Sequence, residues 1–361
     1  MEFGGEQMPT ESFDATEPSR RNLLKAGEWS ICIGAGMSNA LMPDWNTISQ
    51  RMLSKAYGNP VDKDEIELLR KNLGWSLDSL LQHALNTYQL AGRTLENFND
   101  DLAAELYGTL LSAASAYGVD TALTKLLSNP YSRDPTVMLS IESFLTAQFG
   151  QSSLMQLARL LLHAKASSRN PISVLTFNAD VLLHVALTLL QIREAFSTSG
   201  DLSPDFHYRA LYRCTDRPNG KIPIHHIHGS ITPESANREA RDKLVFPESS
   251  YSQLASSVYA WPQTVFLSTA QSSRMVFVGL SMSDPNIRRW LSWCDGYRRA
   301  EISQRGATPL FSCPHIWITT RSTDWRIQRT KETGLLHLGV RTAFIPSWDA
   351  LESALGNLIG L

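Results

Sequence analysis

Four short segments contain the residues that could do chemistry, and each follows an apolar run typical of a buried strand. They are Gly34-Ala35-Gly36-Met37-Ser38, Thr176-Phe177-Asn178-Ala179-Asp180, His228-Gly229 and Gly279-Leu280-Ser281. In open α/β sheets, ligands bind in the crevice beyond the carboxyl ends of the strands. Four such segments therefore predict one nucleotide pocket, built from loops that are far apart in the chain.

The segment 34–38 is a candidate phosphate site. Glycines at a strand end let the backbone approach a pyrophosphate, and free amides at a helix start attract anions. The same residues could form a tight strand-to-helix turn with Ser38 or Asn39 as the N-cap. Asn39 also occupies the position of the third glycine of a dehydrogenase fingerprint, and no strand ending in an acidic residue follows about 20 residues later. Hydride transfer is not expected.

Polar side chains follow the next two apolar runs. Asn178 and Asp180 could satisfy loop amides or cap a helix, but their place at a strand end also suits ligand contact. His228, directly before Gly229, could act as a general base. His226 and His228 would share one strand face as a metal pair. No third ligand with recognisable spacing accompanies them, so metal binding is not favoured.

The loop after the apolar run 275–278 offers Gly279 and Ser281 as ribose or phosphate contacts. Further along, Asp284 followed by Pro285 is a regular helix start and needs no functional role.

The same loop supports a rival interpretation, because residues 279–283 resemble the Gly-x-Ser-x-Gly nucleophile elbow of hydrolases. Asp324 and His337 follow in the order Ser, Asp, His. Ser283, however, replaces the closing glycine and would crowd that strained turn. The rival also leaves the other three segments unexplained.

The surrounding elements predict how these segments meet. Strand candidates are 29–33, then 172–177, 222–228, 275–279, 315–319 and 340–345. Residues 46–168 form amphipathic helices, as the spacing of Leu77, Leu80, Leu81 and Leu85 indicates. The predicted fold is α/β: a doubly wound, Rossmann-like, mostly parallel sheet with a large all-helical insertion, 46–168, after the first strand. Residues 1–20 are predicted to be a mobile tail, and 21–361 one domain.

Composition narrows the function. The 361-residue chain has a net charge of −2 and no arginine-lysine stripe, so direct nucleic-acid binding is not expected. Its four cysteines contain no Cys-x-x-Cys pair, which argues against a zinc ribbon and a disulfide framework. Residues 1–20 have no apolar signal-peptide core, and no apolar stretch is long enough for a bilayer. The chain is therefore predicted to be cytoplasmic.

Together, the motifs resemble the sirtuin-like superfamily, whose pattern runs Gly-Ala-Gly-x-Ser, Pro-Asp-Phe, Thr-Gln-Asn-Ile-Asp, His-Gly and Gly-x-Ser. Here Pro43-Asp44-Trp45 stands for the second motif, Asn46 replaces the arginine that usually follows it, and Phe177 replaces the glutamine of the third. The resemblance covers roughly residues 28–350, with 46–168 outside the motifs. It implies the sirtuin fold and an NAD pocket.

Departures from the pattern point to a subfamily. The four zinc-binding cysteines of protein-deacylating sirtuins are missing after His228-Gly229, so no zinc is expected and the acyl-lysine channel should be absent or altered. The helical insertion, segment 176–180 and segment 279–287 look like the prokaryotic sirtuin-like NAD hydrolases of anti-phage defence. The resemblance implies that NAD is a substrate, cleaved to nicotinamide and ADP-ribose.

The resemblance also implies a role for each motif residue. Asn178 would orient a water or the ribose hydroxyls, and His228 would accept a proton. Asp180 and Asp44 would line the nicotinamide side, with Trp45 closing over it. The remaining residues would bind NAD: Gly34, Ala35, Gly36 and Ser38 its phosphates, Gly279 and Ser281 its adenosine ribose, with Thr176 completing the third motif.

An unrestrained NAD hydrolase would kill its host, so we expect a homo-oligomer, a second defence-system subunit (a sensor or ATPase), or both to gate the pocket. Two other functions share the same motifs. One is a non-hydrolytic regulatory module that binds NAD or ADP-ribose. The other is an NAD-dependent protein deacylase.

Overall fold

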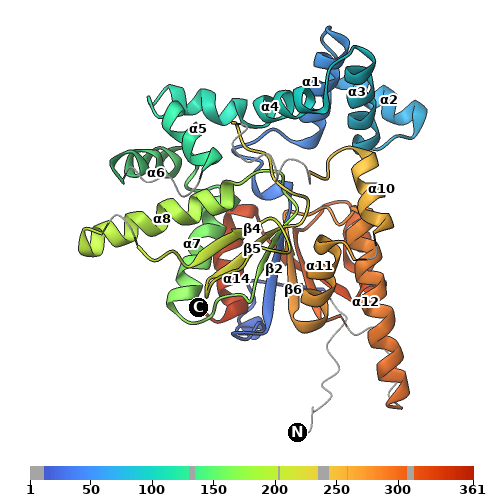
Figure 1. Cartoon of the computed structure of the whole chain (residues 1–361). Coiled ribbons are helices and arrows are strands. Elements are labelled where there is room, and N and C mark those ends of the chain that lie inside the picture. Colours follow the sequence, from blue (N-terminus) through green and yellow to red (C-terminus); the bar gives the residue numbers. More distant parts are fainter. Residues whose placement is uncertain (1–11, 130–134, 202–203, 235–243, 258, 307–312) are drawn as a thin grey trace.

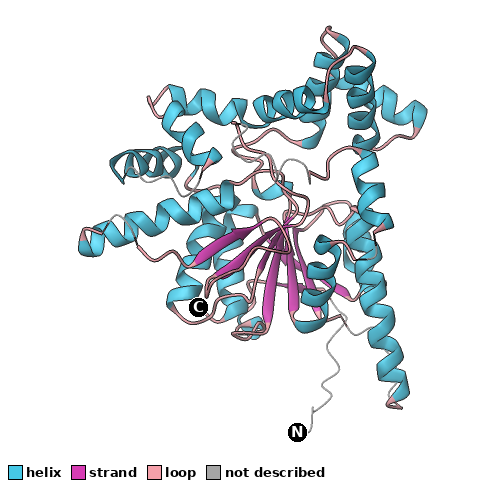
Figure 2. Cartoon of the chain, viewed as in Figure 1, coloured by secondary structure: helices cyan, strands magenta, loops and turns pink. Residues whose placement is uncertain are grey.

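A single parallel sheet forms the centre of the fold (Figure 2). The computed structural model describes residues 12–129, 135–201, 204–234, 244–257, 259–306 and 313–361. Within these residues the sheet has eight strands in the order β1-β8-β7-β6-β2-β3-β5-β4, and every neighbouring pair is parallel. The strands are β1 (Phe13–Asp14), β2 (Trp29–Ile33), β3 (Val174–Thr176), β4 (Tyr208–Leu211), β5 (Ile222–His226), β6 (Arg274–Val278), β7 (His315–Thr320) and β8 (Val340–Ile345).

The strand order reverses at β2. From β2 the chain adds β3, β4 and β5 on one side, then crosses back to add β6, β7 and β8 on the other. Because all strands are parallel, their carboxyl ends lie at one edge. The reversal opens a crevice there between the loops that follow the neighbouring strands β2 and β6. The predicted fold class, an α/β doubly wound Rossmann-like sheet, is confirmed.

Helices occupy most of the chain between β2 and β3 (Figure 1). They are α1 (Trp45–Tyr57), α2 (Lys63–Leu73), α3 (Leu77–Leu90), α4 (Leu95–Ser115), α5 (Asp120–Ser128), α6 (Pro135–Phe149) and α7 (Ser153–Ala166). Figure 1 shows α1 to α5 gathered on one side of the molecule, beyond one end of the strands. We call α1 to α6 the helical layer. Helices α1 to α4 begin at side-chain caps, such as Asp44 for α1 and the Asp62–Glu65 capping box for α2.

Two hydrophobic cores lie on opposite faces of the sheet. Successive strand residues alternate between faces, so Ile31 and Ile33 belong to one core and Cys32 to the other. The first core includes α7, α8 (Leu182–Ser199) and α14 (Leu351–Ile359). The second includes α11 (Trp261–Ser272) and α12 (Pro285–Gln304). Burial on both faces explains why β2, β3 and β6 are apolar runs without polar alternation.

Two parts of the fold differ from the sequence-based expectation. Strand β4 was not predicted, since it is a four-residue edge strand with a half-buried Arg209 in its middle. The N-terminal segment was predicted to be mobile over residues 1–20. Residues 1–11 lie outside the described part, but Phe13 is buried in β1, and β1 pairs with β8. The guanidinium groups of Arg20 and Arg341 lie 5.0 and 4.9 Å from the centre of the Phe13 ring.

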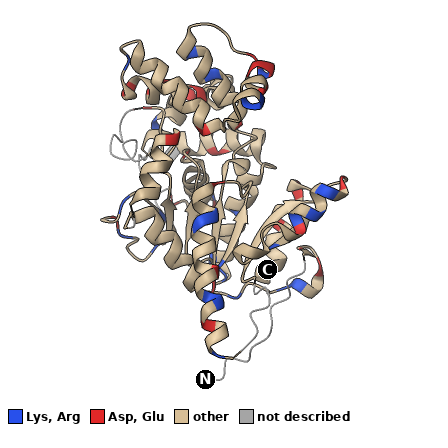
Figure 3. Cartoon of the chain, turned by 90° about the vertical axis from the view of Figure 1, so that its right-hand side faces the viewer, with Lys and Arg blue, Asp and Glu red and all other residues tan. Residues whose placement is uncertain are grey.

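The described residues also form two further helices and several short 3-10 helices. They are α10 (Glu248–Ser256), α13 (Trp325–Thr333) and the short 3-10 helices η1 (Pro18–Arg20), η2 (Ala35–Met37), η4 (Leu336–Leu338) and η5 (Trp348–Ala350). In the view of Figure 3, acidic and basic positions are scattered among the helices. Across the described ranges, no helix combines the length and apolarity needed to cross a membrane.

One buried hydroxyl joins the helical layer to two strand-end loops. Tyr107 of α4 is completely buried. Its Oη donates to the carbonyl of Ile231, 2.8 Å away, and accepts the N–H of Val181 at 3.2 Å. Val181 follows β3 and Ile231 follows β5, and the Ile231 N–H also donates to the Ala179 carbonyl at 2.7 Å. The layer is thereby fixed to the loops that carry Asn178 and His228.

We expect Tyr107→Phe to destabilise the protein by about 2–4 kcal/mol, because a buried N–H and a buried C=O both lose their partner. Tyr208→Phe is the matched control. The Tyr208 hydroxyl is also buried but donates a single hydrogen bond, to the Leu161 carbonyl at 2.8 Å, so its loss should cost about 1 kcal/mol. Chemical denaturation of both variants measures the difference. An equal loss of unfolding free energy in the two variants would show that the two hydrogen bonds of Tyr107 stabilise the protein no more than the single bond of Tyr208.

Candidate functional site

A cavity of about 1250 Å³ lies between the carboxyl ends of the central strands and the helical layer. It brings together eleven of the twelve residues predicted from the sequence. They are Gly34, Ala35, Gly36, Ser38, Asp44, Trp45, Asn178, Asp180, His228, Gly279 and Ser281. Thr176 does not line the cavity; its Oγ1 accepts the N–H of Asn178 at 3.1 Å and so supports a residue that does.

The loops after β2 and β6 are packed backbone to backbone. The Gly34 N–H donates to the Val278 carbonyl at 3.0 Å, and the Gly36 N–H donates to the Gly279 carbonyl at 2.9 Å. A Cβ on Gly36 would lie 2.9 Å from that carbonyl oxygen, and one on Gly279 would lie 2.7 Å from the Met37 nitrogen. Gly279 also has a φ of +67°, where other residues are strained. These glycines therefore permit contact between two loops.

This contact changes the predicted phosphate site. Besides Gly34 and Gly36, the Met37 N–H donates to the Gly34 carbonyl and the Ser38 N–H to the Ala35 carbonyl, each at 3.0 Å. The sequence predicted free amides at the start of a helix. Instead, these four amides are already bonded, and the segment forms the single 3-10 turn η2, which Ser38 ends. The next α-helix, α1, begins only at Trp45.

Ser38, Asn178 and Asp180 form a buried hydrogen-bonded group. The Ser38 hydroxyl donates to Asp180 Oδ2 at 2.9 Å, and Asn178 Nδ2 donates to Ser38 Oγ at 3.2 Å. The other Asp180 oxygen accepts the Leu182 N–H at 2.9 Å. Burial raises the pKa of Asp180, although these hydrogen bonds oppose the shift. Asn178 Oδ1 is left buried, with no hydrogen-bond partner in the described structure.

The His228 ring lies edge-on to two aromatic rings, with centroids 4.9 Å from Phe177 and 5.3 Å from Tyr251. Its Nε2 is buried, accepts or donates no hydrogen bond among the described residues, and lies 3.8 Å from Asp284 Oδ2. Burial lowers the pKa of His228, while Asp284 acts in the opposite direction. The imidazole is therefore neutral at neutral pH, as a proton acceptor must be.

Three residues that line the cavity were not predicted from the sequence as site residues. Asp284 caps α12 as predicted, but only through Oδ1; its other oxygen faces His228. Asp78, in the first turn of α3, lines the same cavity. Burial raises its pKa to about 6, with Asp284 and Glu248 adding to the shift. Phe246 stacks on Trp45 with a centroid distance of 4.3 Å. No local pattern marks Asp78 or Phe246, because only tertiary packing brings them here.

The geometry does not favour a metal site at His226 and His228. The His226 ring stacks on Tyr212, 4.7 Å away, rather than on the neighbours of His228, and burial lowers its pKa to about 3. Across the described residues, no group of three or more His, Cys, Asp or Glu side chains could hold a metal ion.

The sheet topology rules out the alternative interpretation of Ser281, Asp324 and His337 as a hydrolase triad. Ser281 follows the carboxyl end of β6, whereas His337 precedes the amino end of β8, so the two lie at opposite edges of a parallel sheet. Asp324 caps α13. The positive φ angles around the loop also fall on Gly279 and Met282 rather than on Ser281, the expected nucleophile. These residues do not form a catalytic triad.

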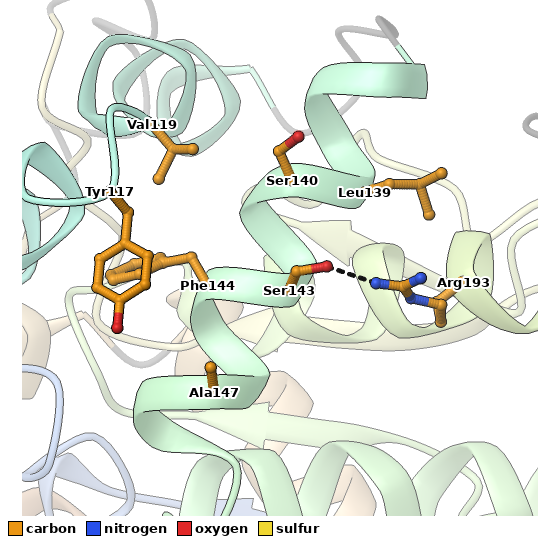
Figure 4. A pocket seen from close by; sticks show the side chains of 8 residues that line it. All are labelled: Tyr117, Val119, Leu139, Ser140, Ser143, Phe144, Ala147 and Arg193. Carbon is orange, nitrogen blue, oxygen red and sulfur yellow. Dashed lines mark hydrogen bonds between the residues drawn. The ribbon is translucent and has the colours of Figure 1, made fainter.

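A second depression, about 600 Å³, lies beside α6, and none of the motif residues lines it (Figure 4). It is lined by Tyr117, Val119, Leu139, Ser140, Ser143, Phe144, Ala147 and Arg193. Its one guanidinium is engaged, since Arg193 donates to Ser143 Oγ and to the buried carboxylate of Glu142. Among these described lining residues no charge is left unpaired for a ligand, so the depression is not the candidate site.

The loop contact predicts opposite effects for two glycine substitutions. Gly279→Ala should destabilise the protein by about 2–4 kcal/mol, because the new Cβ meets the Met37 backbone in a left-handed conformation. Gly296→Ala, in α12 with open space around it, should stabilise by about 0.5–1 kcal/mol. Thermal and chemical unfolding of both variants test this. A Gly279→Ala protein as stable as wild type would contradict the close loop contact.

Comparison with known proteins identifies one matching family. Residues 172–334 match the family model of the SIR2-like domain, a range that contains the segments around Asn178, His228 and Gly279. No curated protein matches the chain. SIR2-like domains are NAD-dependent, so the match supports NAD binding and an NAD-related activity. Residues 172–334 are therefore similar to the SIR2-like domain, and this match supports the resemblance to the sirtuin-like superfamily.

Proposed function

We propose that this protein hydrolyses NAD to nicotinamide and ADP-ribose. The observation that carries the proposal is a pair of unsatisfied polar atoms, Asn178 Oδ1 and His228 Nε2, both buried and both on residues that line the NAD-sized cavity. Strands β3 and β5 are neighbours, and Thr176 pairs with His226. Asn178 lies two positions after Thr176, and His228 lies two positions after His226. Buried polar atoms without partners are costly, and a bound substrate and water would supply the partners.

The reaction breaks the bond between the anomeric carbon of the ribose and the nicotinamide nitrogen. The electron pair of that bond leaves with nicotinamide, which becomes neutral, so no strong acid is needed. Positive charge builds on the ribose, as in glycoside hydrolysis. Water then forms the new C–O bond and gives a proton to His228 Nε2, while Asn178 Oδ1 accepts a hydrogen bond from the water or from a ribose hydroxyl.

Carboxylates on the cavity wall support this charge distribution. Asp44 lines the cavity, and the Thr47 N–H bonded to its Oδ1 lowers its pKa, so the carboxylate is ionised. Asp284 lies against His228 and would stabilise the imidazolium that forms when His228 takes the proton. Trp45 and Phe246, stacked on each other, form an aromatic wall that would exclude bulk water from the reacting ribose.

The biological setting that we propose is NAD depletion by an effector of prokaryotic anti-phage defence, gated by oligomerisation or by a second subunit. The motif resemblance supports this setting, together with the harm that free NAD hydrolysis would cause. Measuring NAD in phage-infected bacteria that express the chain with its neighbouring genes tests it. Unchanged NAD during infection would count against the effector role.

We expect Asn178→Ala and His228→Ala each to lower the rate of nicotinamide release by about 100-fold or more, because in the proposed reaction each variant removes a group that contacts the ribose or the attacking water. His337→Ala is the control, since His337 is exposed at the opposite edge of the sheet. The assay follows nicotinamide from purified chain and NAD, with any partner present. Wild-type rates in both site variants would refute the assignment, and tight NAD binding without turnover would favour the regulatory module.

The pH dependence has a predicted sign. Because burial lowers the pKa of His228, the neutral base persists below the ordinary value of 6.5. The rate should stay flat from pH 8 to about 6.5 and fall only at lower pH, as His228 becomes protonated. Initial rates between pH 4.5 and 8.5, with tryptophan fluorescence as a check on folding, measure this. A rate that already declines between pH 8 and 7 would point to a different base.

A further inference from the structure

The phosphates of a dinucleotide need hydrogen-bond donors in the cavity. Four backbone amides of the glycine loop are occupied by carbonyls. The predicted phosphate cradle therefore offers few free donors unless the loops after β2 and β6 separate. Their separation is opposed by the close packing of Gly34 and Gly36 against Gly279. A pyrophosphate needs charge-assisted donors from elsewhere in the cavity.

Arg70 is such a donor. It lies in the last turn of α2, far in sequence from every motif, and it lines the cavity. Its Nε atom is buried and has no hydrogen-bond partner in the described part of the chain. No ion pair found there includes Arg70, whereas Arg93 of the same helical layer is paired with Asp101. Buried Nε atoms without a hydrogen-bond partner among the described residues also occur at Arg20 and Arg289, but neither of these residues lines the cavity. At Arg70, an anion bound in the cavity would supply the acceptor.

Arg70 differs in charge from the other ionisable residues that line the cavity, apart from His228. Among the described residues that line it, Arg70 is the one lysine or arginine. The acidic lining residues are Asp44, Asp78, Asp180, Asp284 and Asp349. Asn46, next to the stacked Trp45, lines the cavity without a charge. A phosphate would be repelled by most of this wall and attracted at the α2 side.

We propose that Arg70 binds the pyrophosphate of the dinucleotide, so that the helical layer supplies the anion site and the sheet supplies the reacting groups. The planar guanidinium can donate two parallel hydrogen bonds to phosphate oxygens, which a lysine cannot reproduce. This inference rests on the substrate class of the proposed function, but not on turnover. It concerns binding of the ADP-ribose part, which substrate and product share.

The test is titration calorimetry on the full chain with ADP-ribose, which carries the pyrophosphate, and with adenosine, which does not. Arg70→Ala should weaken ADP-ribose binding by about 10- to 100-fold and Arg70→Lys by less, because a charge-assisted hydrogen bond to phosphate is lost or weakened. Adenosine binding should change by less than about twofold. Lys71→Ala is the matched control: Lys71 is the next residue of α2, exposed and outside the cavity lining.

Two results would overturn the inference. One is ADP-ribose binding by Arg70→Ala equal to that of wild type and Lys71→Ala. The other is an equal loss for ADP-ribose and adenosine, which would show a general distortion of the cavity. An unfolding midpoint measured for each variant separates distortion from loss of a contact. Normal ADP-ribose binding by wild type without NAD hydrolysis would contradict the proposed function alone.

Discussion

The site depends on one close contact between two backbones. The loop after β2 and the loop after β6 approach so closely that Gly34, Gly36 and Gly279 have no room for a Cβ. These strands are neighbours at the point where the strand order reverses, so the contact forms the floor of the crevice. Its hydrogen bonds consume amides that would otherwise face a ligand. The glycines thus shape the cavity more directly than they bind its contents.

Above this floor, several buried polar atoms have no hydrogen-bond partner among the described residues. Asn178 Oδ1 and His228 Nε2 lack partners beneath the helical layer, and Arg70 Nε lacks one within it, among the residues that the structure describes. A folded protein tolerates such atoms where a ligand completes their hydrogen bonds. Tyr107 links the two halves, because its hydroxyl bonds to the loops behind both Asn178 and His228. The helical layer and the sheet are therefore parts of one site.

Much of this arrangement could be predicted from the sequence. Strand β2 was predicted with the bounds 29–33 that it has, because a buried parallel strand is a continuous apolar run ended by glycine. The convergence of the four segments followed from parallel strands having their carboxyl ends at one edge. Edge strand β4 escaped notice, since four residues around Arg209 carry too little apolar pattern.

The rest needed tertiary structure. The sequence identified Asp284 as a helix cap, and this role explained the residue without any functional contact. It did not show that the second carboxylate oxygen of Asp284 faces His228. Asp78 and Arg70 lie on amphipathic helices, where the sequence pattern alone predicts that charged residues face solvent. They line the cavity because α2 and α3 fold over it. Whether the amides of Gly34 and Gly36 were free could not be decided from glycine spacing, because their acceptors, the carbonyls of Val278 and Gly279, lie more than 240 residues away in the chain.

Proton NMR of NAD incubated with the purified chain, and with any partner that activates it, would observe the proposed hydrolysis itself. We expect the nicotinamide signals of NAD to be replaced by those of free nicotinamide, with one ADP-ribose formed for each nicotinamide released. NAD that remains intact while bound to the protein would contradict the proposed hydrolysis. So would nicotinamide release that requires an acylated peptide.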